Sequence, residues 1–257
     1  MTQEFAIYPS LRGKTVFVTG GAQGLGRMIA EGLLSAGATV AITSRKADVC
    51  EAAAAEMSAL GRCIALPADL STPEAAVELV ERYRAQVGPC HIVVNNAGMT
   101  FRSSLETFPP EQWHNIMRTN LDSAFYVSQA VVPGMIARKA GKIINICSVM
   151  SELGRPGTAP YTASKGALKM LTKGMAVDWG PHGIQVNGIG PGYFKTELTE
   201  ALVNDATFSG WLIGRTPAKR WGQVQDLVGA AVFLSSDASA FVNGHVLYVD
   251  GGVTASL

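Results

Sequence analysis

Short apolar runs rich in β-branched residues recur along the chain, and most are separated by segments with helical periodicity. The runs are near-continuously apolar, as expected for strands that are covered on both faces of a sheet. Strands that alternate with helices predict a parallel sheet wound on both sides. The predicted strands are residues 15–20, 38–44, 63–69, 90–98, 142–148, 184–192 and 245–252, and the predicted helices are residues 24–36, 47–60, 73–87, 112–137, 158–179 and 224–235. We therefore predict an α/β fold with a Rossmann-type, doubly wound sheet of seven parallel strands.

The length and composition favour a single domain. The chain has 257 residues, of which 47% are apolar and 16% charged, so a core can be buried without a disulfide or a metal. No repeat, low-complexity tract or linker interrupts the pattern, and we expect one domain over residues 1–257. Thr72 before Pro73 predicts a sharp helix start, with a capping hydroxyl and a proline in the first turn.

Charge and cysteine patterns exclude several classes of partner. The net charge is +1 with no basic run, which argues against a nucleic-acid partner. No signal-peptide pattern is present, and no apolar run approaches the ~20 residues that span a bilayer. We expect a soluble protein in the cytoplasm with no membrane partner. The cysteines lack metal-ligand spacing, so we expect free thiols and no metal site: they are Cys50, Cys63, Cys90 and Cys147.

The ends of the predicted strands carry the polar and glycine signals. All seven runs close on Gly, Ser or Asp, and ligands bind outside the carboxyl ends of strands in open α/β sheets. After the first run comes TGGAQGLG, in which Gly20, Gly24 and Gly26 directly precede a predicted helix. Such glycines let backbone N–H groups and the helix N-terminus approach a pyrophosphate. This setting predicts a dinucleotide site.

The residues after the second predicted strand indicate which dinucleotide binds. A carboxylate here would hold the ribose 2′-hydroxyl of NAD, but the sequence has Ser44, Arg45 and Lys46. A guanidinium binds a 2′-phosphate in bidentate fashion. We therefore predict NADP (NADPH), with NAD as a weaker alternative. The other interpretation is that Arg45 and Lys46 are solvated cations at a helix start.

Tyr161 and Lys165 are four residues apart and share one face of a predicted helix. A phenol has a pKa near ~10 and exchanges a proton poorly at neutral pH. A nearby ammonium favours the phenolate and lowers that pKa. Ser148 ends the fifth predicted strand, where its hydroxyl can hold a substrate oxygen. Together with a nicotinamide, these residues predict reversible reduction of a carbonyl group.

In this order and over essentially the whole chain, the motifs resemble the short-chain dehydrogenase/reductase family. The resemblance is carried by TGGAQGLG, NNAG at 95–98, Asn120 in RTNLDSAF, Ser148, YTASK and PGYFKT at 191–196. It implies that Tyr161 is the acid/base, that Lys165 binds the nicotinamide ribose, and that Ser148 holds the substrate oxygen. It also implies that Asn120 links Lys165 to a water-mediated proton relay, although Asn120 also fits as an ordinary polar helix residue.

The same resemblance implies which residues contact the cofactor. Asp69 also fits as a simple strand terminator. The full set of expected cofactor contacts is Gly20, Gln23, Gly24, Leu25, Gly26, Ser44, Arg45, Lys46, Asp69, Leu70, Asn96, Ala97, Gly98, Tyr161, Lys165, Pro191, Gly192, Phe194 and Thr196. The family further implies a homotetramer joined by the C-terminal strand and the helices at 112–137 and 158–179.

The likeness extends to members that act on sugar acids, which predicts a keto sugar acid as substrate. Residues 99–101 and 213–214 lack cations that those members tend to carry, which leaves Arg102 for the substrate carboxylate. Residues 193–222 predict a mobile substrate lid or a subunit contact. Alternatives are a less polar ketone, a 3-oxoacyl carrier-protein thioester, and a non-catalytic NADP-binding regulator. The expected substrate-binding residues are Arg102, Ser148, Met150, Glu152, Tyr161 and Tyr193.

Overall fold

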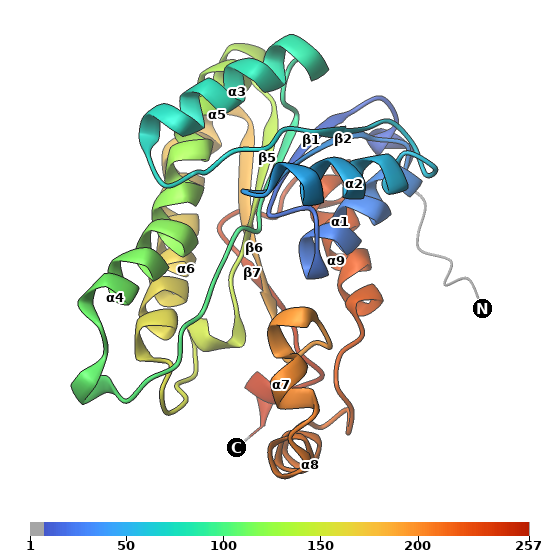
Figure 1. Cartoon of the computed structure of the whole chain (residues 1–257). Helices are drawn as coiled ribbons and strands as arrows, with labels where there is room; N and C mark the ends of the chain where they lie inside the picture. Colours follow the sequence, from blue (N-terminus) through green and yellow to red (C-terminus); the bar gives the residue numbers. More distant parts are fainter. Residues whose placement is uncertain (1–7, 257) are drawn as a thin grey trace.

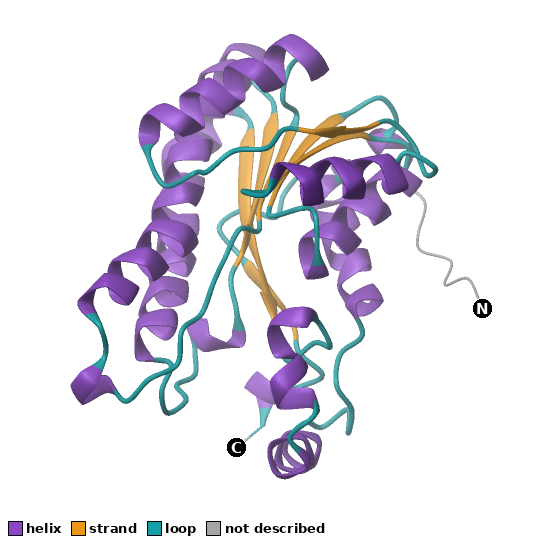
Figure 2. Cartoon of the chain, viewed as in Figure 1, coloured by secondary structure: helices purple, strands orange, loops and turns teal. Residues whose placement is uncertain are grey.

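The computed structural model describes residues 8–256 and places one sheet between two layers of helices (Figure 1, Figure 2). All seven strands are parallel, in the order β3-β2-β1-β4-β5-β6-β7. This confirms the predicted fold class. The strands are β1 (Thr15–Thr19), β2 (Thr39–Thr43), β3 (Cys63–Ala65), β4 (Ile92–Asn95), β5 (Gly141–Ile146), β6 (Ile184–Pro191) and β7 (Val246–Val249). Strands β3, β4 and β7 are shorter than the predicted 63–69, 90–98 and 245–252. The last residues of each prediction belong to the loops that follow, and β4 and β7 also begin one or two residues later.

The helices of the described residues cover both faces of the sheet. They are α1 (Gly24–Ser35), α2 (Ala47–Met57), α3 (Pro73–Val87), α4 (Pro110–Met117), α5 (Ser123–Arg138), α6 (Ala159–Trp179), α7 (Glu200–Val203), α8 (Ala206–Arg215) and α9 (Val228–Ser235). The predicted start of α3 is confirmed, since Thr72 Oγ1 accepts a 3.3 Å hydrogen bond from the Ala75 N–H and Pro73 opens the helix. Among these helices, none has the length and apolar character needed to cross a membrane.

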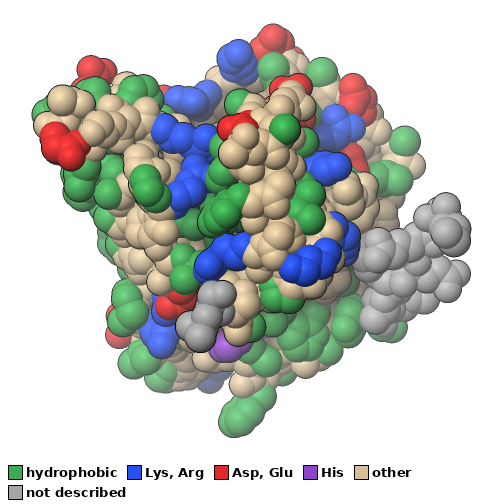
Figure 3. All heavy atoms as spheres, turned by 90° about the horizontal axis from the view of Figure 1, so that it is seen from below, with side chains coloured by type: hydrophobic (Ala, Val, Ile, Leu, Met, Phe, Trp, Pro, Cys, Tyr) green, Lys and Arg blue, Asp and Glu red, His purple; other side chains and the backbone are tan. Residues whose placement is uncertain are grey.

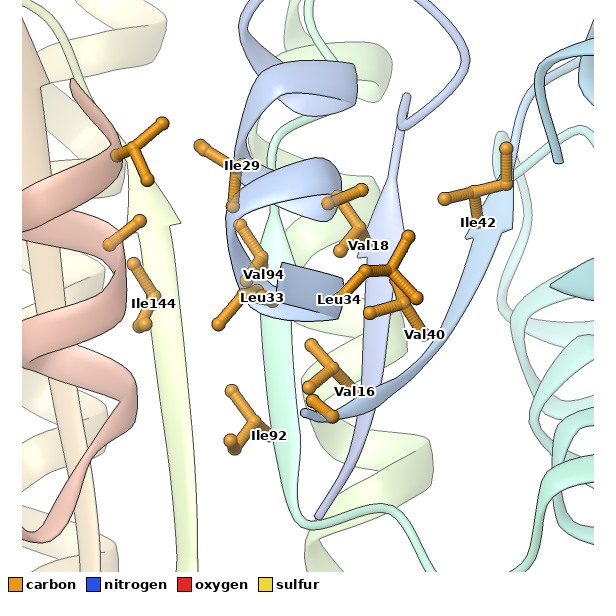
Figure 4. Close-up of a cluster of buried hydrophobic side chains, with 14 of the residues drawn as sticks. Val16, Val18, Ile29, Leu33, Leu34, Val40, Ile42, Ile92, Val94 and Ile144 are labelled. Atoms are coloured by element: carbon orange, nitrogen blue, oxygen red, sulfur yellow. The ribbon is translucent and has the colours of Figure 1, made fainter. Parts of the chain in front are cut away.

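Alternate residues of each strand contribute to the two halves of the core. Val16 and Val18 of β1 belong to the apolar cluster drawn in Figure 4, on the face of the sheet that α1 and α9 cover. Phe17, between them, faces the other way and packs against Tyr83 of α3, with ring centroids 5.3 Å apart. Because side chains alternate across a strand, both faces must be apolar. This is why the strands read as continuous apolar runs in the sequence.

The order of the strands creates the crevice in which a ligand can bind. Chain order runs outward from β1 to β3 on one side, and then returns to place β4 directly beside β1. The loops after β1 and β4 therefore diverge at the carboxyl edge of the sheet, which is the usual binding position in this architecture. The face seen from below carries Lys and Arg side chains in several places, between hydrophobic and uncharged atoms (Figure 3).

Two predicted helical regions differ in kind from the structure, and the predicted helix at 47–60 ends earlier, at Met57. The predicted helix at 112–137 consists of α4 and α5 joined by a π-helical turn, Arg118–Asp122. The predicted helix at 224–235 begins with a 3₁₀ turn, so that α9 itself starts at Val228. The segment 193–222, predicted as a long excursion, contains the helices α7 and α8 at the lower end of the molecule in Figure 1.

Candidate active site

A cavity of about 500 Å³ opens at the carboxyl edge of the sheet. Its wall comes from the loops after β1, β2, β3, β4, β5 and β6, and from α6. The sequence-predicted residues on this wall are Gly20, Gln23, Gly24, Leu25, Gly26, Ser44, Arg45, Asp69, Leu70, Asn96, Ala97, Gly98, Ser148, Tyr161, Lys165, Pro191, Gly192, Phe194 and Thr196. Six predicted residues lie outside the wall: Lys46, Arg102, Asn120, Met150, Glu152 and Tyr193.

The glycine loop has the geometry that a pyrophosphate requires. Gly20 and Gly24 have positive φ angles of 63° and 53°, which side chains other than glycine rarely adopt. A Cβ on Gly26 would lie 2.3 Å from both the Gly20 carbonyl oxygen and Asn96 Nδ2. Helix α1 then begins after Gln23 with no side-chain cap and no acid in its first turn. Its first N–H groups are therefore available to an anion, and the loop fits a dinucleotide.

Asn96 and Thr19 hold this loop against the end of β4. Asn96 Nδ2 donates to the carbonyl oxygens of Thr19 and Gly20, at 3.0 and 2.9 Å. Thr19 Oγ1 accepts from the N–H groups of Asn96 and Ala97, both at 3.0 Å. These four bonds cross the point at which the strand order reverses. They fix the two loops that a dinucleotide would span.

The loop after β2, which carries Arg45 and Lys46, also leads into a helix that has no side-chain cap. Lys46 is the N-cap residue of α2, and its side chain makes no capping bond. Ser44 Oγ donates to the Lys46 carbonyl oxygen at 3.1 Å, and Ser44 and Arg45 face the cavity. Neither Arg45 nor Lys46 forms an ion pair with any acid in the described part of the chain. A helix start with two nearby cations is a suitable place for a phosphate.

Ser148, Tyr161 and Lys165 meet on the cavity wall from two elements. Ser148 follows β5, and Tyr161 and Lys165 lie one turn apart on α6. Lys165 is 4% exposed, and its Nζ donates a 2.7 Å hydrogen bond to the Ile146 carbonyl oxygen. The Nζ atom lies 5.8 Å from the centroid of the Tyr161 ring. Ser148 Oγ accepts a 3.1 Å bond from the Met150 N–H, which orients the hydroxyl.

Burial shifts the pKa values of both titratable side chains of this cluster, Tyr161 and Lys165. It raises the pKa of the Tyr161 phenol, while interactions with Ser148 and the charge of Arg155 work in the opposite direction. It lowers the pKa of the Lys165 ammonium to about 8. The sequence predicted that Lys165 would lower the pKa of Tyr161, whereas in the structure this pKa is raised. Burial opposes the charged form of both side chains and therefore disfavours the phenolate. At neutral pH Tyr161 is therefore a neutral phenol that can donate a proton.

Asn120 lies behind the wall, in the π-helical turn between α4 and α5, and is 1% exposed. Its Oδ1 accepts from the Met99 N–H at 2.7 Å, and its Nδ2 donates to Met99 O and Ser164 Oγ, both at 3.0 Å. Ser164 Oγ in turn donates to the Tyr161 carbonyl oxygen at 2.7 Å. The side chain of Asn120 thus ties the loop after β4 to the helix that carries Tyr161. Single π-helical turns of this kind are common at functional sites.

Of the residues predicted to bind substrate, only Ser148 and Tyr161 line the cavity. Met150 is buried, and Glu152 is occupied by an ion pair with Lys169 and a 2.7 Å bond from Tyr248 Oη. Tyr193 Oη accepts a 3.3 Å bond from Arg155 Nη1. Arg155, which the sequence reasoning missed, lies in the loop between Ser148 and Tyr161. The position of Arg155 in the sequence, between Ser148 and Tyr161, could have identified it as a candidate site residue.

Cavity residues that were not predicted mostly adjoin predicted ones: Ala22, Thr43, Ala68, Ser71, Met99, Thr119, Ser123, Ile146, Cys147, Glu197 and Thr199. Burial raises the pKa of the Cys147 thiol to about 11, so this cysteine is not a thiolate nucleophile at neutral pH. Within residues 8–256, no cluster of His, Cys, Asp and Glu side chains is arranged to hold a metal ion.

Three comparisons relate the chain to known oxidoreductases. Residues 20–254 match the family model described as enoyl-(acyl carrier protein) reductase. The chain is 52% identical to gluconate 5-dehydrogenase of Gluconobacter oxydans (96% of this chain and 97% of the relative) and 49% identical to 5-keto-D-gluconate 5-reductase of Escherichia coli K12 (96% and 98%). A gluconate 5-dehydrogenase from Burkholderia cenocepacia, solved in complex with NADP and tartrate, superposes with a TM-score of 0.93 at 49% identity. That match covers 97% of this chain and 99% of that chain.

Proposed function

The chain belongs to the short-chain dehydrogenase/reductase family of oxidoreductases, and we propose that it reversibly reduces the 5-keto group of a sugar acid with NADPH. D-Gluconate and 5-keto-D-gluconate are the proposed pair of substrates. One observation supports the proposal most directly. Ser148, Tyr161 and Lys165 line a cavity that is also lined by the glycine loop and by the start of α1, which has no side-chain cap. Relatives of this chain are named for that substrate pair, and a structural relative was solved with NADP.

In the proposed reduction, Ser148 Oγ holds the substrate carbonyl oxygen and Tyr161 Oη donates a proton to it. The nicotinamide of bound NADPH supplies the hydride. The raised pKa of Tyr161 suits this direction, because the phenol remains protonated at neutral pH. Lys165, fixed by its bond to Ile146 O, presents its ammonium beside the phenol and stabilises the phenolate left after proton donation. In this proposal Asn120 has two roles. It positions α6 through its bond to Ser164, and it takes part in a water-mediated proton relay to Lys165.

The proposed cofactor contacts follow the cavity wall from the glycine loop to the catalytic residues. The N–H groups at the start of α1 would bind the pyrophosphate, and Ser44, Arg45 and Lys46 would bind the 2′-phosphate. Asp69, Leu70 and the 96–98 turn would flank the adenosine. Residues at the end of β6, with Phe194 and Thr196, would hold the nicotinamide carboxamide. Met150, Glu152 and Tyr193 remain proposed substrate contacts together with Arg102.

The test of the proposed function is the initial rate of NADPH oxidation with 5-keto-D-gluconate. The same measurement is made with NADH, with a panel of neutral ketones and with a 3-oxoacyl thioester. We expect NADPH-dependent turnover that is at least tenfold more efficient on the keto acid. Efficient turnover restricted to neutral ketones or to the thioester would contradict the substrate. Cofactor binding without turnover on any of these compounds would favour a regulator.

We also propose that residues 193–222 form a substrate lid and that the protein is a cytoplasmic homotetramer. Phe208 of that segment packs against Trp211, Trp221 and Tyr193, which gives the proposed lid an aromatic cluster. Met170 and Val177 of α6 are exposed apolar side chains, as a subunit contact requires. The four cysteines are free, which suits a reducing compartment. Light scattering that reports a monomer would contradict the assembly.

A further inference from the structure

Two arginines from neighbouring loops, Arg102 and Arg155, lie outside the wall of the cavity. The loop of Arg102 lies next to the loop of Arg155, since a Cβ on Gly157 would lie 3.6 Å from the Ser103 carbonyl oxygen. Burial and the neighbouring charge of Arg155 lower the pKa of the Arg102 guanidinium. Neither arginine forms an ion pair with any acid among residues 8–256. Two uncompensated like charges at short range are unfavourable in the absence of an anion.

Aromatic rings and a hydroxyl hold Arg155 in place. Its Cζ lies 5.2 Å from the centroid of the Phe208 ring and 5.8 Å from that of Tyr193, within the range of cation–π attraction. Its Nη1 donates to Tyr193 Oη at 3.3 Å. Because Tyr193 Oη accepts this bond, its own proton is free to be donated elsewhere. The other N–H groups of the guanidinium make no hydrogen bond within the described structure. Arg155 and Tyr193 together therefore offer several hydrogen-bond donors to one anion.

The nearest acid in the sequence does not neutralise Arg155. Glu152 is three residues away, but its carboxylate pairs with Lys169 and accepts from Tyr248 Oη. Arg155 does act on the catalytic phenol, whose pKa its charge lowers. The guanidinium is thus within electrostatic range of Tyr161, although it lies outside the wall of the cofactor cavity. A ligand that reaches both must extend from the reacting carbonyl to a distant anionic group.

We propose that Arg155 and Tyr193 bind the carboxylate of the substrate, and that Arg155 selects an acidic ketone over a neutral one. The inference rests on the proposed function, which it extends to the far end of the substrate. A guanidinium binds a carboxylate through two parallel N–H bonds, which a lysine cannot reproduce. The exposed Arg102, also a proposed substrate contact, adds a second positive charge for the same carboxylate. Since Tyr193 and Phe208 both belong to the 193–222 segment, carboxylate binding would also draw that segment towards the site.

The experiment compares two substrates in Arg155→Met, Arg155→Lys and wild-type protein. The substrates are 5-keto-D-gluconate and L-sorbose, which has the same keto group and hydroxyl configuration with CH₂OH in place of the carboxylate. We expect Arg155→Met to lower kcat/KM for the keto acid roughly 10- to 100-fold, with L-sorbose changed less than about threefold. The kcat/KM of Arg155→Lys for the keto acid should lie between the values of the wild type and of Arg155→Met. Arg62→Met is the matched control. The Arg62 side chain lies just before β3, and among the described residues it donates only to the Gln86 carbonyl oxygen in α3, so its loss should leave both substrates unchanged.

A second readout separates this inference from the proposed function. Binding of D-gluconate to the NADPH complex, followed by thermal shift, needs no turnover and should be lost in Arg155→Met while NADPH binding is kept. Loss of activity on both substrates to the same extent, or on neither, would overturn the role of Arg155. Wild-type protein that binds D-gluconate through Arg155 but does not reduce the keto acid would overturn the proposed function alone. Absence of D-gluconate binding in the wild type would overturn both.

Discussion

Lys165 Nζ donates a 2.7 Å hydrogen bond to the main-chain carbonyl oxygen of Ile146, the last residue of β5. The bond holds a nearly fully buried ammonium at the carboxyl edge of the sheet, beside the Tyr161 ring. A neutral carbonyl compensates an ammonium only in part, so burial still lowers the pKa of Lys165 to about 8. The protein therefore keeps an unfavourable charge at the place where the phenolate must be stabilised.

This arrangement predicts an unusual dependence of stability on pH. The folded-state pKa of Lys165 lies below the ordinary value of 10.5, so between about pH 8 and 10.5 the unfolded chain binds the extra proton and stability rises with pH. Relative to Lys165→Met, the wild-type apoprotein should gain roughly 2 kcal/mol of unfolding free energy from pH 7.5 to 10. Urea unfolding at several pH values measures this. Parallel curves for the two proteins would mean that Lys165 titrates normally.

Tyr161→Phe should abolish turnover and leave cofactor binding intact. The substitution removes only the phenolic oxygen that donates the proton, and general acid catalysis contributes about 10²- to 10⁴-fold to a rate. The aromatic ring that packs beside Lys165 remains. Single-turnover rates with 5-keto-D-gluconate and fluorescence titration with NADPH give the two readouts. A variant that keeps more than about a tenth of the wild-type rate would remove Tyr161 from the mechanism.

The parts of the fold that the sequence revealed are those with local, repeated signals. Val16, Phe17 and Val18 are all buried because both faces of β1 are covered, and this gives a continuous apolar run that is visible without a structure. Gly20 and Gly24 were recognisable because their positive φ angles favour glycine. The same local logic identified the capped start of α3 at Thr72.

Features that depend on distant contacts were not predictable in this way. Arg155 gains its meaning from Tyr193 and Phe208, which are far along the chain and reach it only through the fold. The π-helical turn at Arg118–Asp122 interrupts a region whose apolar pattern reads as one helix. Helix α8, by contrast, had a local signal that the sequence reasoning missed, because Asp205 caps it by accepting from the N–H groups of Thr207 and Phe208.

Arg45→Ala should reduce preference for NADPH over NADH. Arg45 lies on the cavity wall after β2 and has no acidic partner within the described residues, so its guanidinium is available to a 2′-phosphate. Loss of one charge-assisted contact should raise KM for NADPH roughly 10- to 100-fold. NADH lacks the phosphate and provides an internal control, for which KM should change little. Equal effects on both cofactors would mean that Arg45 acts only as a solvated cation at the start of α2.

Gly26→Ala should disrupt both cofactor binding and stability, whereas Gly210→Ala should not. A Cβ at Gly26 would lie 2.3 Å from the Gly20 carbonyl oxygen, and neither this backbone atom nor Asn96, which is held by two bonds, can move freely. We expect a loss of about 1–3 kcal/mol in unfolding free energy, together with loss of measurable NADPH binding.

Gly210 is the matched control, because it lies inside α8 and nothing beyond its own helix backbone comes within 4 Å of the place that an alanine Cβ would take. Alanine there should add up to about 1 kcal/mol of stability through helix propensity. Denaturant unfolding and NADPH titration of the two variants test this contrast. A Gly26→Ala protein that still binds NADPH normally would show that the glycine loop can admit a Cβ at position 26 without losing its cofactor-binding geometry.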